Sequence, residues 1–213
     1  MKISLFLSLL LFSHTSFSST WVGKQKALVL LLEWPNVNQT KTKEEVEQTF
    51  FGENNLSLRQ YFKENSNGKF DFSGKVMDWR QAKVRFNESR GCSLDYIVDQ
   101  AKSVFMQDVD ISKYDEDGNG KVDNLFVVHS GRIPHDRVGP SCTFTRDRSA
   151  DHMVVFQIGG IGTKGKDIGI GFYLHEGGHE YFNLPDLYGN HYRGKYGIGM
   201  WGMMGLGAWG VSN

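Results

Sequence analysis

The sequence predicts an α/β fold in which a sheet packs against helices. Apolar runs of the length of a strand buried on both faces are spread along the chain. Segments with the apolar spacing of amphipathic helices lie between these runs, and strands that alternate with helices are typical of α/β domains. The runs are 27–34 (ALVLLLEW), 124–130 (NLFVVHS) and 153–158 (MVVFQI).

Length and charge narrow the class of protein further. The 213 residues are enough for one domain with its own apolar core. The formal net charge is zero and the pI is near 7, and no stripe of Lys or Arg stands out. We therefore expect neither a nucleic acid nor an anionic membrane as a partner.

The N-terminus has the pattern of a secretory signal peptide. Met1 and Lys2 precede an apolar run over 3–12, and small polar residues follow over 13–20. We expect residues 1–19 to be removed and residues 20–213 to form the exported, secreted protein. The apolar run is too short to cross a bilayer as a transmembrane helix. An uncleaved membrane anchor is the alternative.

Export also bears on the two cysteines. Cys92 and Cys142 would lie in an oxidising compartment, which predicts one disulfide bond between them. The alternative is two free thiols. Neither cysteine has metal-ligand spacing to a neighbouring residue.

The first half of the chain is expected to add two short helices and a strand to the run over 27–34. A helix is predicted over 42–51 and a second one over 57–65, where Ser57 can cap the N-terminus. Asn67-Gly68 is a turn signal. After it, alternating apolar residues over 70–76 predict a strand or a hairpin.

The longest amphipathic helix begins at Ser93, with a wide apolar face from Leu94 to Phe105. In the following strand, His129 is expected to be a buried core residue rather than a ligand. Gly160, Gly162 and Gly165 match a dinucleotide-binding pattern, but no helix opens there. We interpret these glycines as a loop.

An acidic segment precedes the strand over 124–130. Its oxygen-bearing side chains and its glycine at the sixth position match the first part of an EF-hand loop, but Phe126 replaces the final glutamate. We therefore expect a calcium-binding loop without an exit helix, and a solvated Asx-turn is the alternative. The expected ligands are Asp115, Asp117, Asn119, the carbonyl of Lys121, and Asp123.

The segment His175-Glu176-Gly177-Gly178-His179 predicts a zinc site on a helix. Two histidines four residues apart lie on the same face of a helix, so both imidazoles reach one metal ion. Glu176 between them can take a proton from water at that ion. The alternative is a solvated helix with two incidental histidines.

A catalytic zinc needs a third protein ligand. No glutamate follows Glu180, and the downstream candidates are Asp186 and His191. Asn183 tolerates the left-handed conformation that ends helices, and Pro185 prevents the helix from continuing. We favour Asp186, because this stop lets the chain fold back under the metal.

Several stretches together resemble the immune inhibitor A family of secreted zinc metallopeptidases, which belong to the metzincins. The active-site helix of metzincins is followed by a turn with a methionine beneath the zinc. The matching stretches are spread over nearly the whole chain that follows the predicted signal peptide. They are ALVLLLEWPNV, SLRQYFKENSNGKF, YDEDGNGKVDNLFVVHSG, HEGGHEYFNLPDLYG and GMWGMMGLGAWG.

The resemblance implies a metzincin-like catalytic domain with a twisted, mostly parallel sheet. It implies that His175, His179 and Asp186 bind zinc and that Glu176 is the general base. Met204 would form the floor of the site. Tyr188 is a candidate for stabilising the oxyanion, and a packing tyrosine is the alternative.

The sequence departs from this family at the end of the helix and at its C-terminus. The family has a glycine three residues after the second histidine, where Phe182 stands, and one extra residue precedes Asp186. If Asn183 makes the turn, the helix gains one residue and the acid still reaches the metal. The sequence ends nine residues after Met204, where the family continues with further helices.

These observations predict a secreted, zinc-dependent endopeptidase that acts on a protein or peptide. An extended substrate would pair with an edge strand of the sheet, for which 153–158 is a candidate. The alternative is an exported protein that binds zinc or calcium, or a truncated metallopeptidase homologue without catalysis.

Overall fold

In the computed structural model of the protein, strand β1 (Gly23–Glu33) lies inside a parallel sheet. Helices surround this sheet. The described residues are 22–53, 57–87, 94–131, 150–157, 170–189 and 197–209. Strand β1 pairs with β2 (Phe70–Val76) and β3 (Arg80–Gln81) along one edge and with β4 (Val122–His129) along the other.

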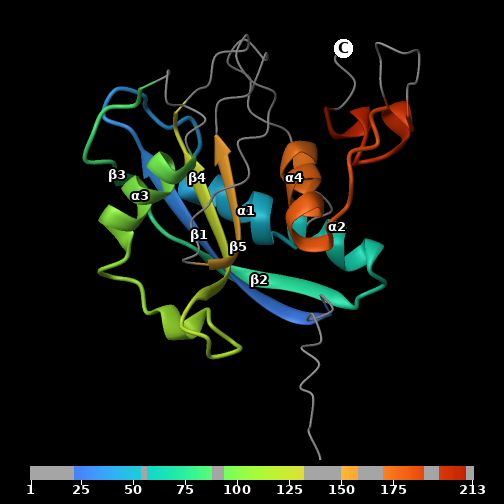
Figure 1. Ribbon diagram of the computed structural model, residues 1–213, viewed down its shortest axis with the longest axis horizontal. Helices are drawn as coiled ribbons and strands as arrows, with labels where there is room; N and C mark the ends of the chain where they lie inside the picture. The colour runs from blue at the N-terminus through green and yellow to red at the C-terminus, as the bar shows by residue number, and fades with distance from the viewer. Residues whose placement is uncertain are drawn as a thin grey trace, which may run out of the picture.

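Strand β5 (Ala150–Gln157) pairs with β4, which gives the strand order β2-β1-β4-β5 (Figure 1). Each of these pairings is parallel. The prediction of an α/β fold with a sheet packed against helices is therefore confirmed.

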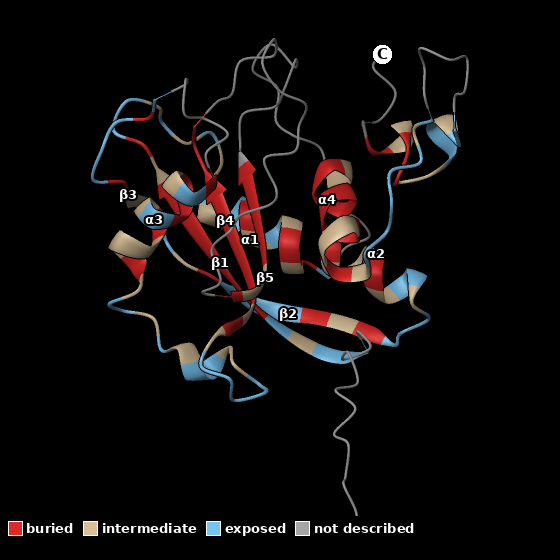
Figure 2. Cartoon of the chain, viewed as in Figure 1, coloured by how far each residue is buried: buried red, intermediate tan, exposed pale blue. Residues whose placement is uncertain are grey.

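Both faces of this sheet are covered, which explains why β1 is apolar without alternation. Its residues 27–32 are fully buried, and Figure 2 shows the same for most of β4 and β5. Ala27, Val29 and Leu31 face the helices α1 (Lys43–Phe51), α2 (Leu58–Asn65) and α4 (Ile170–Phe182). The intervening leucines face α3 (Leu94–Phe105).

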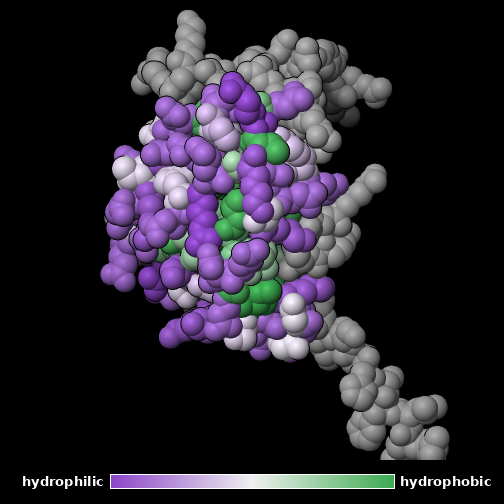
Figure 3. Space-filling view, turned by 90° about the vertical axis from the view of Figure 1, so that its left-hand side faces the viewer, coloured by the Kyte–Doolittle hydropathy of each residue, from purple (hydrophilic) through white to green (hydrophobic). Residues whose placement is uncertain are grey.

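The side of the molecule seen in Figure 3 is largely hydrophilic, with small apolar patches.

The local signals in the first half of the chain correspond to the observed elements. Thr42 and Glu45 form a capping box at the start of α1, and Ser57 accepts a hydrogen bond from the Gln60 amide at the start of α2. Asn67 and Gly68 both have positive φ, so the predicted turn is confirmed. The hairpin alternative for 70–76 is wrong, because β2 runs parallel to β1.

Several predictions concern residues outside the described ranges. These are the signal peptide, Cys92 and Cys142 with their disulfide, the loop with Gly160, and His191. Within the described ranges, no helix has the length and apolar character needed to span a bilayer.

His129 at the end of β4 is a core residue, as predicted. Its Nδ1 accepts hydrogen bonds from the indole N–H of Trp34 at 3.2 Å and from the backbone N–H of Gly131 at 3.0 Å. Burial lowers the pKa of His129 to about 3. The imidazole therefore stays neutral in the folded protein across the physiological range.

Acid sensitivity of folding is expected to depend strongly on His129. In the unfolded chain His129 is protonated below about pH 6.5, whereas in the folded protein it stays neutral down to about pH 3. The folded protein therefore loses stability as the pH falls from 6.5 to 3. The free energy of unfolding should fall by up to about 1.4 kcal/mol per pH unit from this group. Urea unfolding at pH 7, 5 and 4 should show a shallower loss for His129→Gln, which keeps an acceptor oxygen. Parallel pH profiles of the two proteins would contradict the expectation.

Candidate metal centre

Helix α4 carries the two histidines and the glutamate of the predicted zinc site. Phe172, Tyr173 and Tyr181 anchor the helix in the core on one face of the sheet. The side chain of His175 is 3% exposed, that of His179 is 16% exposed, and Glu176 is buried. The prediction of a helix at this motif is confirmed.

The paired glycines of the motif allow close packing on two sides of α4. A Cβ on Gly177 would lie 3.3 Å from Cζ of Phe62 in α2. A Cβ on Gly178 would lie 2.7 Å from Sδ of Met204. Glycine weakens a helix by about 1 kcal/mol relative to alanine. Here the missing side chains let α2 and the Met204 segment approach the helix.

The helix ends at Phe182, and Asn183 makes the turn that the sequence required. Asn183 has a φ of +50°, and its N–H donates to the carbonyl of His179 at 3.1 Å. This is a left-handed helix cap with asparagine in place of glycine. The N–H of Leu184 then donates to the carbonyl of Gly178 at 3.2 Å, so the chain folds back along the helix.

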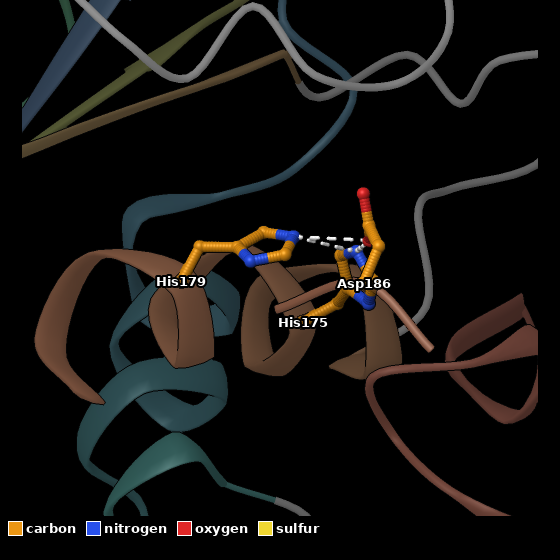
Figure 4. Close-up of side chains that lie close together, drawn as sticks. All are labelled: His175, His179 and Asp186. Carbon is orange, nitrogen blue, oxygen red and sulfur yellow. Dashed lines mark hydrogen bonds and ion pairs between the residues drawn. The ribbon is translucent and has the colours of Figure 1, made fainter. Parts of the chain in front are cut away.

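This return brings Asp186 to the two histidines (Figure 4). Its Oδ1 lies 3.1 Å from Nε2 of His175 and 3.2 Å from Nε2 of His179. The two Nε2 atoms are 3.0 Å apart. Donors at zinc-ligand distance in a tetrahedral arrangement are about 3.3 Å apart, so the three atoms have the spacing of a metal-ligand set. The side chain of Asp186 is 55% exposed, which leaves the site open to solvent on that side.

Both histidines have a fixed tautomer. Nδ1 of His175 lies 2.8 Å from the carbonyl oxygen of Met203, and Nδ1 of His179 lies 2.6 Å from that of Leu184. Since a carbonyl only accepts hydrogen bonds, each Nδ1 carries a hydrogen, and in the neutral imidazole each Nε2 presents a lone pair. Two lone pairs and a carboxylate oxygen thus face one another, an arrangement that a cation stabilises.

Tyr188 and Met204 also lie at this centre. The hydroxyl of Tyr188 is 2.9 Å from Nε2 of His175, so it adds a polar group beside the donor atoms. Met204 is buried, and its carbonyl accepts a hydrogen bond from the N–H of Leu187 at 2.7 Å. The segment that contains Met204 is thus bonded to the loop that carries Asp186 and Tyr188.

Glu176 shares a helix face with Glu180, one turn further along α4. Oε1 of Glu180 is 3.4 Å from the backbone nitrogen of Met153 and 3.4 Å from Nδ1 of His152, both in β5. This face of α4 therefore points toward β5, the terminal strand in the described order and the strand nearest to α4 in Figure 1. On the helix, the position of Glu176 falls between the face that carries the histidines and the face that carries Glu180.

No protein-family model matches the chain, and a comparison with curated proteins finds no significant match.

The acidic loop forms a second cluster of possible metal ligands. The carboxylates of Asp115, Asp117 and Asp123 lie within 4.8 Å of one another. Gly118 and Gly120 have positive φ, and the loop leads directly into β4, as predicted. Burial raises the pKa of Asp123, and the neighbouring carboxylates raise it further. A cation would relieve this repulsion.

Asn119 and Lys121 connect this loop to β5. The side-chain oxygen of Asn119 accepts a hydrogen bond from the Lys121 N–H, and its amide group donates to Asp117 and to Asp151. The Lys121 ammonium lies 3.0 Å from Asp151. Sequence reasoning missed Asp151, because only the parallel register of β4 and β5 brings it to the loop.

Proposed function

We propose that the protein is a zinc-dependent endopeptidase with a metzincin-like catalytic domain of the immune inhibitor A type. One observation carries the proposal: His175, His179 and Asp186 direct three donor atoms to one point, and a backbone carbonyl lies at Nδ1 of each imidazole, so that Nε2 is the nitrogen directed at that point. This donor set is typical of a catalytic zinc site that keeps an open position.

Zinc bound at these donors would supply a Lewis acid that polarises a peptide carbonyl and acidifies water. The carboxylate of Glu176 would accept a proton from the attacking water and return it to the nitrogen of the leaving amine. The hydroxyl of Tyr188 would donate a hydrogen bond to the developing oxyanion. An extended peptide would lie over α4 and beside β5, on the side of the helix that Glu180 turns toward the strand.

The acidic loop is a second part of the proposal. We infer that Ca²⁺ binds to the carboxylates of Asp115, Asp117 and Asp123, since hard oxygen donors on a loop with left-handed glycines suit this ion. The ion would stabilise the junction between the loop and β4. The predicted signal peptide would bring the protein to an oxidising compartment, either the periplasm or the exterior of the cell.

Elemental analysis and a casein assay test both parts. The dialysed protein should contain one zinc per chain together with calcium, and it should cleave casein. A zinc-selective chelator should abolish cleavage, and added zinc should restore it. Zinc without cleavage would favour an exported metal-binding protein, and calcium without zinc would favour a calcium-dependent structural module. Either result would overturn the proposed activity.

A further inference from the structure

Gly178 lies on the side of α4 where the turn with Met203 and Met204 rests. The Cβ of any other residue there would lie 2.7 Å from Sδ and 3.4 Å from Cε of Met204. A contact of 2.7 Å is well inside the van der Waals distance of carbon and sulfur. The Met204 side chain therefore packs directly on the bare backbone at position 178, and any side chain there would require its sulfur to move.

This turn holds two of the three proposed donors. The carbonyl of Met203 is hydrogen-bonded to Nδ1 of His175 at 2.8 Å and fixes its tautomer. The carbonyl of Met204 accepts the N–H of Leu187, the residue after Asp186, at 2.7 Å. The depth at which the turn sits on α4 thus sets the place of both the His175 ring and the Asp186 carboxylate.

We propose that Gly178 is a positioning residue of the metal centre. Because it lacks a side chain, the Met203–Met204 turn can approach α4 to the depth at which His175 and Asp186 share one cation. This inference rests on the proposed zinc function. Metal donors must be placed within about 0.2 Å, so a small lift of the turn is enough to weaken binding.

An apolar cavity of about 270 Å³ adjoins Met204 and offers its side chain another position. A methyl group at position 178 would push the sulfur into this space or lift the turn. Either outcome changes the packing of Met204 on the helix beside the proposed donors. The cavity is lined by Phe62, Leu174, Leu184, Leu187, Ile198 and Met203, among others.

The chain offers a matched control in the neighbouring glycine. Gly178→Ala and Gly177→Ala make the same change of residue type in the same helix and raise its helix propensity equally. Only the first places a methyl group against Met204, since Gly177 faces Phe62. Zinc dissociation constants from chelator competition should rise about 10- to 100-fold for Gly178→Ala and stay within about threefold for Gly177→Ala. Thermal unfolding of the metal-free proteins should show that both variants fold.

The Met204→Ala variant tests whether Gly178→Ala lowers zinc affinity through its contact with Met204. In Met204→Ala the space occupied by the sulfur is vacated, so adding Gly178→Ala should cost little further zinc affinity. The visible spectrum of the cobalt-loaded proteins should change with Gly178→Ala only when Met204 is present. Equal zinc affinity of the two glycine variants, or an undiminished loss in Met204→Ala, would overturn the inference. If the unaltered chain binds no zinc, the proposed function itself fails.

Discussion

Glu176→Gln is expected to lower casein cleavage by on the order of a thousandfold and to leave one zinc per chain. The amide has nearly the shape of the carboxylate, but it cannot take a proton from water, and proton transfer of this kind contributes about 10²- to 10⁴-fold to enzymatic rates. Zinc should remain, because the donor atoms belong to His175, His179 and Asp186. Initial rates of casein cleavage and elemental analysis of the same preparation measure both quantities.

Glu180→Gln is the matched control for this substitution. Glu180 stands one turn along the same helix face, and glutamine there keeps an oxygen to accept the N–H of Met153. Its cleavage rate should stay within about threefold of the unaltered protein, because Glu180 is no part of the proposed proton transfer. If the unaltered protein binds one zinc yet cleaves casein no faster than Glu176→Gln, the proposal of a peptidase is wrong.

The sheet could be predicted because its strands are buried on both faces. The continuous apolar runs of β1, β4 and β5 identify them without any knowledge of neighbours. The start of β1 at Gly23 could not be predicted from its own residues, Gly23 to Lys26, which are mostly polar and exposed. Pairing with β2, from Gly23 opposite Phe70 onward, extends the strand.

The grouping of His175, His179 and Asp186 was predictable to the extent that these residues are close in sequence. His175 and His179 follow from helix geometry, and Asp186 follows from the stop at Asn183 and the lack of other acids downstream. The hydrogen bonds that orient the rings were not predictable, because they come from carbonyl groups, which every residue has. The carbonyl of Met203 comes from a turn 28 residues further along the chain, which packs beside Gly178 through Met204.

Asn183 is the residue on which the third ligand depends, and its own side chain is exposed. Its importance lies in the backbone, since a φ of +50° is tolerated by asparagine and glycine and is strongly disfavoured by a β-branched residue. The same turn places the Leu184 carbonyl on Nδ1 of His179. The left-handed conformation of Asn183 thus orients the ring of His179 and brings Asp186 close to the two histidines.

Asn183→Val is therefore expected to weaken zinc binding about a hundredfold, because the turn relaxes and both the Leu184 carbonyl and Asp186 leave their places. Asn183→Gly should bind zinc as the unaltered protein does, since glycine adopts this conformation freely. Asn67→Val is the control for strain alone: Asn67 has a φ of +53°, is exposed and follows α2, away from the donors. Both valine variants should lower the melting temperature, but chelator competition should detect lost zinc affinity only for Asn183→Val. Equal zinc affinity of the two valine variants would mean that the turn does not position Asp186.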